Sequence, residues 1–272
     1  MFKKILIANR GEIAVRIIRT CREMGIRTVA IYEAADQGSL HVRLADECVT
    51  VPDHHAFMDS EQIIDIARQV GADAVHPGYG FLAEDAAFIQ ACDEAELMFI
   101  GPPANVVALT RNKIGALERA RAAGIPTVNF SAVSFSEAEG DNLRIAADEM
   151  GYPMVLKSCS GGRGRGERLV TKPEYLTDAV RRSRSEARTV YGNQRLYIEQ
   201  AILPAHQVGV QILADRQGNM IHLGEREGSL IQHNQKIIEK LPPWFNGRTA
   251  RGTAGNCAGN SAVVQLSKHR DS

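Results

Sequence analysis

Short apolar runs alternate with helical patterns along about the first hundred residues of the chain. The runs have the length and composition of buried strands, and they lie at 4–9, 28–32, 47–51, 72–76 and 97–100. Between them, apolar residues recur at helical spacing in the segments 12–24, 60–70 and 84–94. Strands that alternate with helices in this way predict a doubly wound parallel sheet, which places this part of the chain in the α/β class.

A second α/β pattern follows the clearest break in the first half, the triplet Gly101-Pro102-Pro103. A helical stretch covers 104–123 and ends before Gly124-Ile125-Pro126. Beyond it the pattern predicts a helix at 136–150, a strand at 153–157, a helix at 173–191 and a strand at 196–199. A hairpin is expected from the strands 208–214 and 220–225.

These patterns divide the chain into three parts. We predict a first domain over residues 1–112 and a second over 113–243, with residues 127–202 as a subdomain of the second. Residues 244–272 are rich in Gly, Asn, Ser and Thr and show no sustained periodicity. That composition predicts a poorly ordered tail.

The composition is that of a globular protein and excludes several partners. Hydrophobic residues make up 44% of the 272 residues, and the 32 basic side chains are balanced by 32 acidic ones. A net charge of zero favours neither nucleic acid nor a membrane surface as a partner. No apolar run is long enough to span a membrane, and the first residues do not have the pattern of a signal peptide. The five cysteines are widely spaced without a CxxC pair, so we expect neither zinc nor a disulfide framework, and a cytoplasmic location.

The glycine-rich segment after the strand 153–157 is the strongest candidate for binding phosphate. Glycines let a backbone fold tightly and point its N–H groups at an anion, and Lys157, Arg163 and Arg165 add positive charge. The segment lacks the Gly-Lys-Ser/Thr of a P-loop, and a strand rather than a helix is expected after it. A flexible, exposed hairpin remains the alternative interpretation.

Three further positions are weaker candidates when taken alone. Lys113 begins a helix after a turn, and Lys236 lies on the polar face of a predicted strand, so both have solvation as the simpler interpretation. Glu199 ends a strand before the apolar pair Ala201-Ile202, an arrangement that could offer backbone groups and an apolar wall to a purine. An ordinary hairpin entry is the alternative.

The histidines are expected to be structural. His76 ends a strand before a Pro-Gly turn, where a hydrogen-bonded structural histidine is the favoured interpretation. The pair His54-His55 has no further His or Cys at a ligand spacing. We therefore assign no metal ligand in this chain.

Taken together, these segments resemble the N-terminal part of biotin carboxylase, an ATP-grasp enzyme that occurs in acetyl-CoA, propionyl-CoA and pyruvate carboxylases. The resemblance extends in order and spacing from residue 2 to about residue 242. Its most specific segments are NRGEIAVRIIR at 9–19 and HPGYGFLAE at 76–84, followed by GYPMVLK, LYIEQ, VQILAD and NQKIIE. It implies a doubly wound N-terminal domain that serves as scaffold, followed by an incomplete ATP-grasp domain whose lid is the subdomain 127–202.

The resemblance also implies a set of nucleotide-site residues, each by position alone. They are Lys113 and Lys157 as phosphate-contacting lysines; Gly162, Arg163 and Gly164 in the lid over the triphosphate; Glu199, Gln200, Ala201 and Ile202 beside adenine; Gln207 on the ribose side; and Asn234, where many members have His. Lys236 matches a lysine that helps to hold bicarbonate and is the one catalytic candidate.

The implied reaction has two steps. Bicarbonate attacks the γ-phosphate of ATP to give carboxyphosphate, and the carbon dioxide released from it carboxylates biotin on a carrier protein or domain. A carboxyltransferase component then uses the product, and a homodimer is possible. The family's Mg²⁺-binding glutamates and general base come after the NQK segment, where residues 244–272 match nothing. The alternatives are a non-catalytic nucleotide-binding module that pairs with a complete subunit, and another ATP-grasp ligase.

Several positions depart from the family pattern near the implied site. Arg163 interrupts the glycine run, Gln200 replaces a usual lysine, and Gln207 replaces a histidine. Gly209 replaces an acidic residue, and Ile231 replaces a glutamine beside the nucleotide. Because these changes cluster near the site, we expect impaired turnover.

Overall fold

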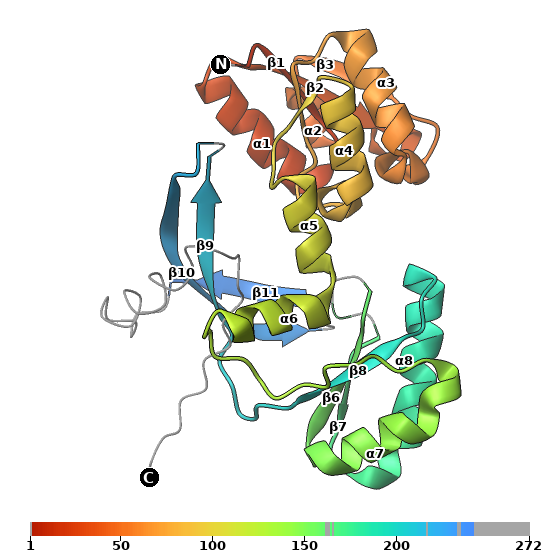
Figure 1. The fold of residues 1–272 in the computed structure, drawn as a ribbon. Coiled ribbons are helices and arrows are strands. Elements are labelled where there is room, and N and C mark those ends of the chain that lie inside the picture. The colour runs from red at the N-terminus through yellow and green to blue at the C-terminus, as the bar shows by residue number, and fades with distance from the viewer. Residues whose placement is uncertain (1, 161–163, 165, 216, 233–234, 242–272) are drawn as a thin grey trace. The chain divides into compact units, whose positions relative to one another are not determined.

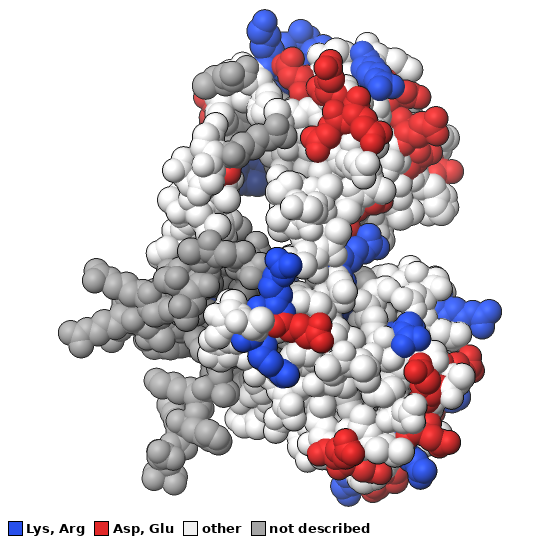
Figure 2. Space-filling model, in the orientation of Figure 1, with Lys and Arg blue, Asp and Glu red and all other residues white. Residues whose placement is uncertain are grey.

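The computed structural model describes residues 2–160, 164, 166–215, 217–232 and 235–241 (Figure 1). The chain forms two compact units, Met1–Leu109 and Thr110–Ser272. Basic and acidic side chains are interspersed on the described face of each unit seen in Figure 2, as the balanced composition leads one to expect. Among the described residues, no helix combines the length and the apolar character needed to cross a membrane.

The first unit is built on a five-stranded parallel sheet with the strand order β3-β2-β1-β4-β5. Its strands are β1 (Lys4–Ile7), β2 (Arg27–Tyr32), β3 (Glu47–Thr50), β4 (Ala74–His76) and β5 (Met98–Phe99). The chain moves outward from β1 to β3, then returns to the other side of β1 for β4 and β5. This order confirms the predicted doubly wound parallel sheet.

Helices cover both faces of this sheet (Figure 1). They are α1 (Gly11–Glu23), α2 (Leu40–Leu44), α3 (Ser60–Val70) and α4 (Ala86–Glu94), with the short 3₁₀ turns η1 (Ala34–Asp36), η2 (His54–Met58) and η3 (Phe81–Glu84). Alternate residues of β1 enter opposite cores: Ile5 and Ile7 pack with α1, and Leu6 packs with α3 and α4. Burial on both faces explains why the strands read as continuous apolar runs.

The helical stretch expected over 104–123 is two helices, so that prediction was wrong in one respect. It divides into α5 (Ala104–Arg111) and α6 (Lys113–Ala122) at Asn112. The backbone of Asn112 is extended, and its side-chain oxygen accepts a hydrogen bond from the Gly115 N–H at 3.0 Å. This N-cap satisfies a donor that a new helix leaves open, and it makes Lys113 the first residue of α6.

The second unit contains a three-stranded antiparallel sheet with the order β7-β6-β8. Its elements are β6 (Met154–Ser158), β7 (Arg168–Val170) and β8 (Leu196–Gln200), with η4 (Glu137–Glu139), α7 (Gly140–Met150), η5 (Pro173–Tyr175) and α8 (Leu176–Tyr191). One face buries Met154 and Leu156 of β6 and Leu196 and Ile198 of β8 against α7 and α8. The residues between them therefore point to the opposite face.

A second antiparallel sheet in this unit has the order β11-β10-β9. Its strands are β9 (Val208–Ala214), β10 (Met220–Gln232) and β11 (Gln235–Lys240), so the predicted hairpin has a longer second strand and gains a third. The neighbouring residues Ile237 and Ile238 are each 55% exposed. Because neighbours on a strand face opposite sides, apolar side chains are exposed on both faces of this sheet.

Candidate active site

Lys157, Tyr197 and Glu199 share the face of the β6–β8 pair that lies away from α7 and α8. Lys157 and Tyr197 are directly opposed in the antiparallel register, and Glu199 follows Tyr197 two residues later. Opposed residues and residues two apart lie on one face of a sheet. The Lys157 Nζ lies 2.9 Å from Oε2 of Glu199, and the Tyr197 hydroxyl donates to Oε1 of Glu199 at 2.7 Å.

Burial governs the charge state of this cluster. Tyr197 is 1% exposed and Glu199 is 7% exposed. Loss of water around the phenol, followed by the negative charge of Glu199, raises the pKa of Tyr197 well above its ordinary value. Tyr197 therefore stays protonated, and its hydroxyl donates a hydrogen bond to one oxygen of Glu199. The Lys157 ammonium lies next to the other oxygen and neutralises the charge of the carboxylate.

The second predicted phosphate lysine is also paired with a carboxylate. Lys113, at the N-terminus of α6, places its Nζ 3.2 Å from Oε1 of Glu167, and both side chains are about one quarter exposed, at 22% and 27%. Glu167 lies between the glycine-rich loop and β7. Its charge also contributes to the raised pKa of Tyr197, so the two ion pairs lie within electrostatic reach of each other.

The glycine-rich loop is described only in part, since Gly162 and Arg163 lie outside the described residues. Gly164 and Gly166 have positive φ values of 66° and 76°, a conformation that side chains rarely adopt. A Cβ at Gly166 would approach the Ser183 carbonyl oxygen to 3.3 Å and the Cβ atoms of Ala187 and Ser158 to 3.4 Å. The strand β7 follows the loop, as predicted.

The segment predicted to line adenine follows Glu199 directly. The Gln200 N–H donates to the Asn129 carbonyl at 2.8 Å, and the Ala201 N–H donates to the Pro153 carbonyl at 3.2 Å, which fixes the end of β8. Gln200 is exposed, and Ala201 and Ile202 are half-buried. The apolar Ile202 is therefore available to contact a flat ring.

Gln207 offers an open hydrogen-bond acceptor. Its backbone is fixed, because its N–H donates to Oγ of Ser229 at 2.8 Å and its carbonyl accepts from the Gly228 N–H at 2.8 Å. Its side-chain Oε1 is buried and has no hydrogen-bond partner among the described residues. A buried oxygen without a donor is costly, and the ribose-side role of Gln207 stays a prediction.

Lys236 lies on the other sheet of the unit. It is opposed to Ile231 in β10, and its Nζ lies 3.6 Å from Oε1 of Glu239. A Cβ at Gly228 would come within 2.8 Å of the Lys236 Cδ, so the absence of a side chain at that position lets the lysine stem cross β10. Asn234 lies outside the described residues.

The sequence analysis missed two residues of the candidate site, Glu167 and Tyr197. Glu167 lies among charged loop residues and has no local pattern that distinguishes it. Tyr197 could have been found, because it alternates with Glu199 on a strand whose other face is apolar. A polar residue at each alternate position of an otherwise buried strand indicates a second, functional face.

The donor set of the described site does not fit a Mg²⁺ ion. Magnesium normally takes one or two carboxylates together with substrate phosphates. Glu167 and Glu199, the described carboxylates of the site, are each engaged by a lysine. Elsewhere, Asp53, His54 and His55 bring ligand atoms within 4.8 Å of one another, but all three are exposed, and Asp53 already accepts from the His55 N–H at 2.7 Å.

The structure confirms that His76 is a hydrogen-bonded structural histidine. Its Nδ1 accepts a hydrogen bond from the Gly78 N–H at 3.0 Å, within the Pro-Gly turn that follows β4. Burial lowers the pKa of the imidazole. A neutral ring that accepts from the backbone fixes the turn.

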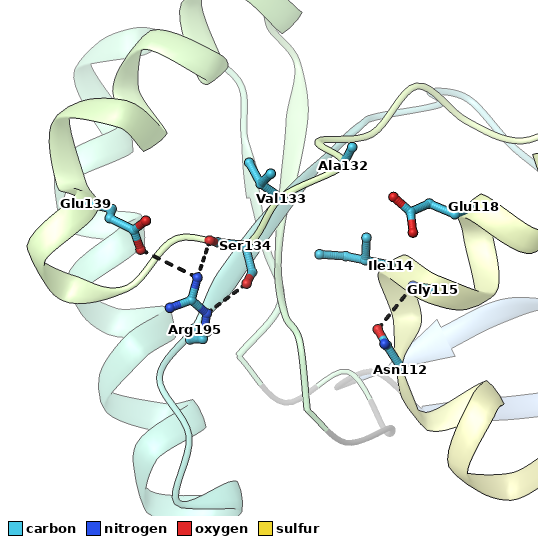
Figure 3. Close-up of a pocket in the computed structure, with 9 residues that line it drawn as sticks. All are labelled: Asn112, Ile114, Gly115, Glu118, Ala132, Val133, Ser134, Glu139 and Arg195. Atoms are coloured by element: carbon cyan, nitrogen blue, oxygen red, sulfur yellow. Dashed lines mark hydrogen bonds and ion pairs between the residues drawn. The ribbon is translucent and has the colours of Figure 1, made fainter. Parts of the chain in front are cut away.

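A hollow of about 450 Å³ lies beside the start of α6 (Figure 3). Its lining comprises Asn112, Ile114, Gly115, Glu118, Ala132, Val133, Ser134, Glu139 and Arg195, and thus none of the predicted site residues. Arg195 is held there by Ser134, whose Oγ accepts from Nε at 2.7 Å and whose carbonyl accepts from Nη2 at 2.5 Å. Because its arginine already has partners, the hollow gains no ligand role from this geometry.

Comparison with known proteins places the two units in known domain families. Residues 1–107 match the family model "Biotin carboxylase, N-terminal domain", and residues 112–258 match "Carbamoyl-phosphate synthase L chain, ATP binding domain". The chain therefore belongs to the class of proteins in which an ATP-binding domain follows a biotin carboxylase N-terminal domain in the sequence. The chain belongs to the biotin carboxylase family, which confirms the resemblance.

Two relatives show how far the likeness extends. The chain is 43% identical over 245 residues to biotin carboxylase 1 of Bacillus subtilis, which covers 89% of this chain and 54% of that protein. It is 42% identical over 244 residues to the 2-oxoglutarate carboxylase small subunit of Hydrogenobacter thermophilus, covering 89% and 51%. The chain thus spans about half the length of the curated relatives it matches.

Solved structures agree. The biotin carboxylase domain dimer of Hydrogenobacter thermophilus 2-oxoglutarate carboxylase, in complex with MgADP, ADP and bicarbonate, has a TM-score of 0.89 and 39% identity. That comparison covers 95% of this chain and 57% of the other. A Campylobacter jejuni biotin carboxylase in complex with a β-γ-ATP ligand has a TM-score of 0.87 and 34% identity, covering 96% and 60%.

Proposed function

We propose that this chain supplies the N-terminal domain and the nucleotide-binding lid of an ATP-dependent biotin carboxylase. The observation that supports it best is the pair of lysine–carboxylate contacts, Lys113 with Glu167 and Lys157 with Glu199, beside the glycine-rich loop. Two relatives of known structure were solved with adenine nucleotides bound. The lysines of the site thus have the charge and the place to neutralise a triphosphate.

The residues of the chain divide the work of holding ATP. Lys113 and Lys157 each have three N–H donors, so they donate to phosphate oxygens while they keep their carboxylate partners, and the glycine-rich segment offers backbone N–H groups to the same anion. Ile202 contacts the adenine ring, beside the backbone groups of Glu199, Gln200 and Ala201. The buried Oε1 of Gln207 accepts a ribose hydroxyl, which removes its unsatisfied state.

The reaction proposed for the complete enzyme is the one that the resemblance to biotin carboxylase implies. A bicarbonate oxygen attacks the γ-phosphorus of ATP, ADP leaves, and carboxyphosphate forms. Carboxyphosphate breaks down to phosphate and carbon dioxide, which bonds to a ureido nitrogen of biotin as that nitrogen loses its proton. Lys236 is proposed to hold the bicarbonate anion. Closure of the lid excludes water, which would otherwise consume the intermediate.

The partners proposed for this chain are those of the family. They are a biotin carboxyl carrier protein or domain, a carboxyltransferase component and a second copy of the chain in a homodimer; one solved relative is described as a dimer. We propose a cytoplasmic location, which the free thiols of Cys21, Cys48, Cys92 and Cys159 support.

Titration with ATP tests the proposal. Isothermal titration of the purified chain with ATP, ADP and GTP should show binding of both adenine nucleotides and at least tenfold weaker binding of GTP. Equal affinity for GTP would remove the adenine assignment, and no binding of any nucleotide would overturn the function.

A second candidate function is a nucleotide-binding module without turnover of its own. The engagement of both described carboxylates by lysines favours it, because neither is free for a metal. In this case the chain binds ATP and associates with a complete biotin carboxylase subunit. Co-purification with a full-length relative, together with ATP binding and no ATP hydrolysis, distinguishes this function from the first.

A further inference from the structure

Tyr197, Glu199 and Lys157 form one chain of contacts on the face of the β7-β6-β8 sheet that lies away from α7 and α8. The Tyr197 hydroxyl donates to one carboxylate oxygen of Glu199 at 2.7 Å, and the other oxygen lies 2.9 Å from the Lys157 Nζ. Tyr197 is also the residue directly opposed to Lys157 in the β6–β8 register. The phenol is thus a neighbour of Lys157 across the two strands and is hydrogen-bonded to Glu199, the acidic member of the ion pair.

Because Tyr197 and Glu199 are buried, these two residues and Lys157 are held in one conformation. A buried carboxylate is stable only when its oxygens have partners, and those of Glu199 have two different ones. The tyrosine has two rotatable side-chain bonds and is fully buried, so it fixes the carboxylate more firmly than water could. The carboxylate in turn restricts the long, flexible side chain of Lys157.

We propose that Tyr197 is a positioning residue of the nucleotide site, which holds Lys157 in place through Glu199. The inference rests on the proposed function, in that the ligand of Lys157 is the phosphate of ATP. Tyr197 acts on the nucleotide only through Glu199 and Lys157. It reduces the conformational freedom that Lys157 would otherwise lose on binding.

The other ion pair of the site is built differently. Glu167 is 27% exposed where the side chain of Glu199 is 9% exposed, and its pair with Lys113 is longer, at 3.2 Å. Water can therefore replace either member of the Lys113–Glu167 pair at little cost. The site thus contains one firmly held lysine and one adjustable lysine, and only the first depends on a tyrosine.

The first test measures ATP affinity in a double-mutant cycle. Tyr197→Phe keeps the ring and all charges and removes the one hydroxyl; we expect about three- to tenfold weaker ATP binding from the loss of a bond to a charged group. In a Lys157→Ala background, Tyr197→Phe should cause no further loss, because the tyrosine acts through that lysine. Tyr152→Phe is the matched control. It removes a hydroxyl that contacts Asp148 at 3.5 Å, and Tyr152 packs against the core between the sheet and the helices α7 and α8, away from Lys157.

Additive losses in the cycle would overturn the proposal, and so would an ATP affinity that Tyr197→Phe leaves unchanged while Lys157→Ala weakens it. Either result would leave the proposed nucleotide function intact. A purely structural role of Tyr197 would lower the free energy of unfolding in both backgrounds without the coupling to Lys157.

The second test needs no nucleotide. Competitive acetylation of the folded chain, followed by mass spectrometry, reports the accessibility and basicity of each lysine amine. We expect Tyr197→Phe to raise the acetylation rate of Lys157 severalfold while that of Lys113 stays the same, and Tyr152→Phe to change neither. An unchanged rate at Lys157 would overturn the positioning role. Failure of the wild-type chain to bind ATP, together with a raised rate at Lys157, would overturn the nucleotide function and support the positioning role.

Discussion

The amine of Lys113 lies 3.2 Å from the carboxylate of Glu167, although the two residues are fifty-four positions apart in the chain. The contact joins the first residue of α6 to the end of the glycine-rich loop. It exists because Asn112 begins a new helix at that point and so turns Lys113 out of a continuous helical surface. A carboxylate therefore lies next to a lysine that we assign to phosphate.

We expect Glu167→Gln to strengthen ATP binding about two- to fivefold. The substitution removes an anion that competes for Lys113 and repels phosphate, and the partly exposed pair contributes only about 0–1 kcal/mol to stability. Titration calorimetry at two salt concentrations measures the effect, which should shrink at high salt. Glu186→Gln, which breaks the similarly exposed pair with Arg168, is the matched control. Weaker ATP binding in Glu167→Gln would show that the carboxylate assists the nucleotide.

Lys157→Ala should weaken ATP binding by about ten- to a hundredfold. The lysine would lose a charge-assisted contact worth roughly 1.5–3 kcal/mol. Titration with ATP measures the loss, and circular dichroism checks that the fold is retained. Lys172→Ala, which removes an exposed lysine from the same unit, should leave the affinity unchanged. An unchanged affinity in Lys157→Ala would remove this lysine from the site.

The packing of the β7-β6-β8 sheet against α7 and α8 predicts a large loss of stability when a buried side chain of this sheet is truncated. Leu156 is fully buried against α7 and α8, so Leu156→Ala should lower the free energy of unfolding by about 2–5 kcal/mol. Leu169 in the neighbouring strand is 50% exposed, and Leu169→Ala should cost less than about 1 kcal/mol. Urea unfolding followed by circular dichroism compares the two. Equal losses would contradict the assignment of the buried face.

Asp73 predicts a pH dependence of the first unit. Its carboxylate accepts from the backbone N–H groups of Lys3 and Lys4 at 2.6 and 2.9 Å, and these bonds lower its pKa below the ordinary value of 3.8. A lowered folded pKa contributes stability above the unfolded pKa and loses it as the pH falls through the folded value. Asp73→Asn should therefore be less stable than wild type at pH 6, with a difference that shrinks below about pH 3.8. Urea unfolding across this range measures it, and a constant difference would contradict the prediction.

The parts of the fold that the sequence predicted best are those with a strong local period. The helix α3 was placed at its observed ends, and the buried strands of the parallel sheet read as apolar runs because both faces are covered. The helix start expected at Lys113 is confirmed, but the helical stretch expected over 104–123 ignored the break at Asn112, because one polar residue within a helical period is ordinary. Only the contact with the Gly115 N–H makes Asn112 a cap.

The candidate site likewise has residues that the sequence predicts and contacts that it does not. Lys157 could be proposed from its place at the end of a strand before the glycine-rich segment, and Lys113 from the family resemblance, but the carboxylate partners of the two lysines could not be proposed. Glu167 meets Lys113 across a long sequence separation, and the bond between Tyr197 and Glu199 depends on a register that the sequence of one strand does not contain. Pairing of this kind follows from tertiary structure, so a local pattern cannot predict it.

The chain by itself should be close to inactive in biotin carboxylation, even where it binds ATP. The described carboxylates of the site, Glu167 and Glu199, are each neutralised by a lysine, which leaves neither to hold a metal or to accept a proton from bicarbonate. Loss of a general base costs roughly 10²–10⁴ in rate, and loss of a positioned charge costs roughly 10²–10³. These losses combine without simple additivity, and their joint effect should approach the uncatalysed rate.

A steady-state assay with free biotin, bicarbonate and MgATP measures this activity, with full-length biotin carboxylase 1 of Bacillus subtilis as the positive control. We expect bicarbonate-dependent ADP release by the chain to stay at the level of a reaction mixture without protein, because both described carboxylates of the site are neutralised by lysines and neither can activate the nucleophile. Turnover comparable to that of the full-length relative, abolished by Lys236→Ala, would contradict the prediction. It would show that the chain activates bicarbonate through Lys236 without a separate carboxylate.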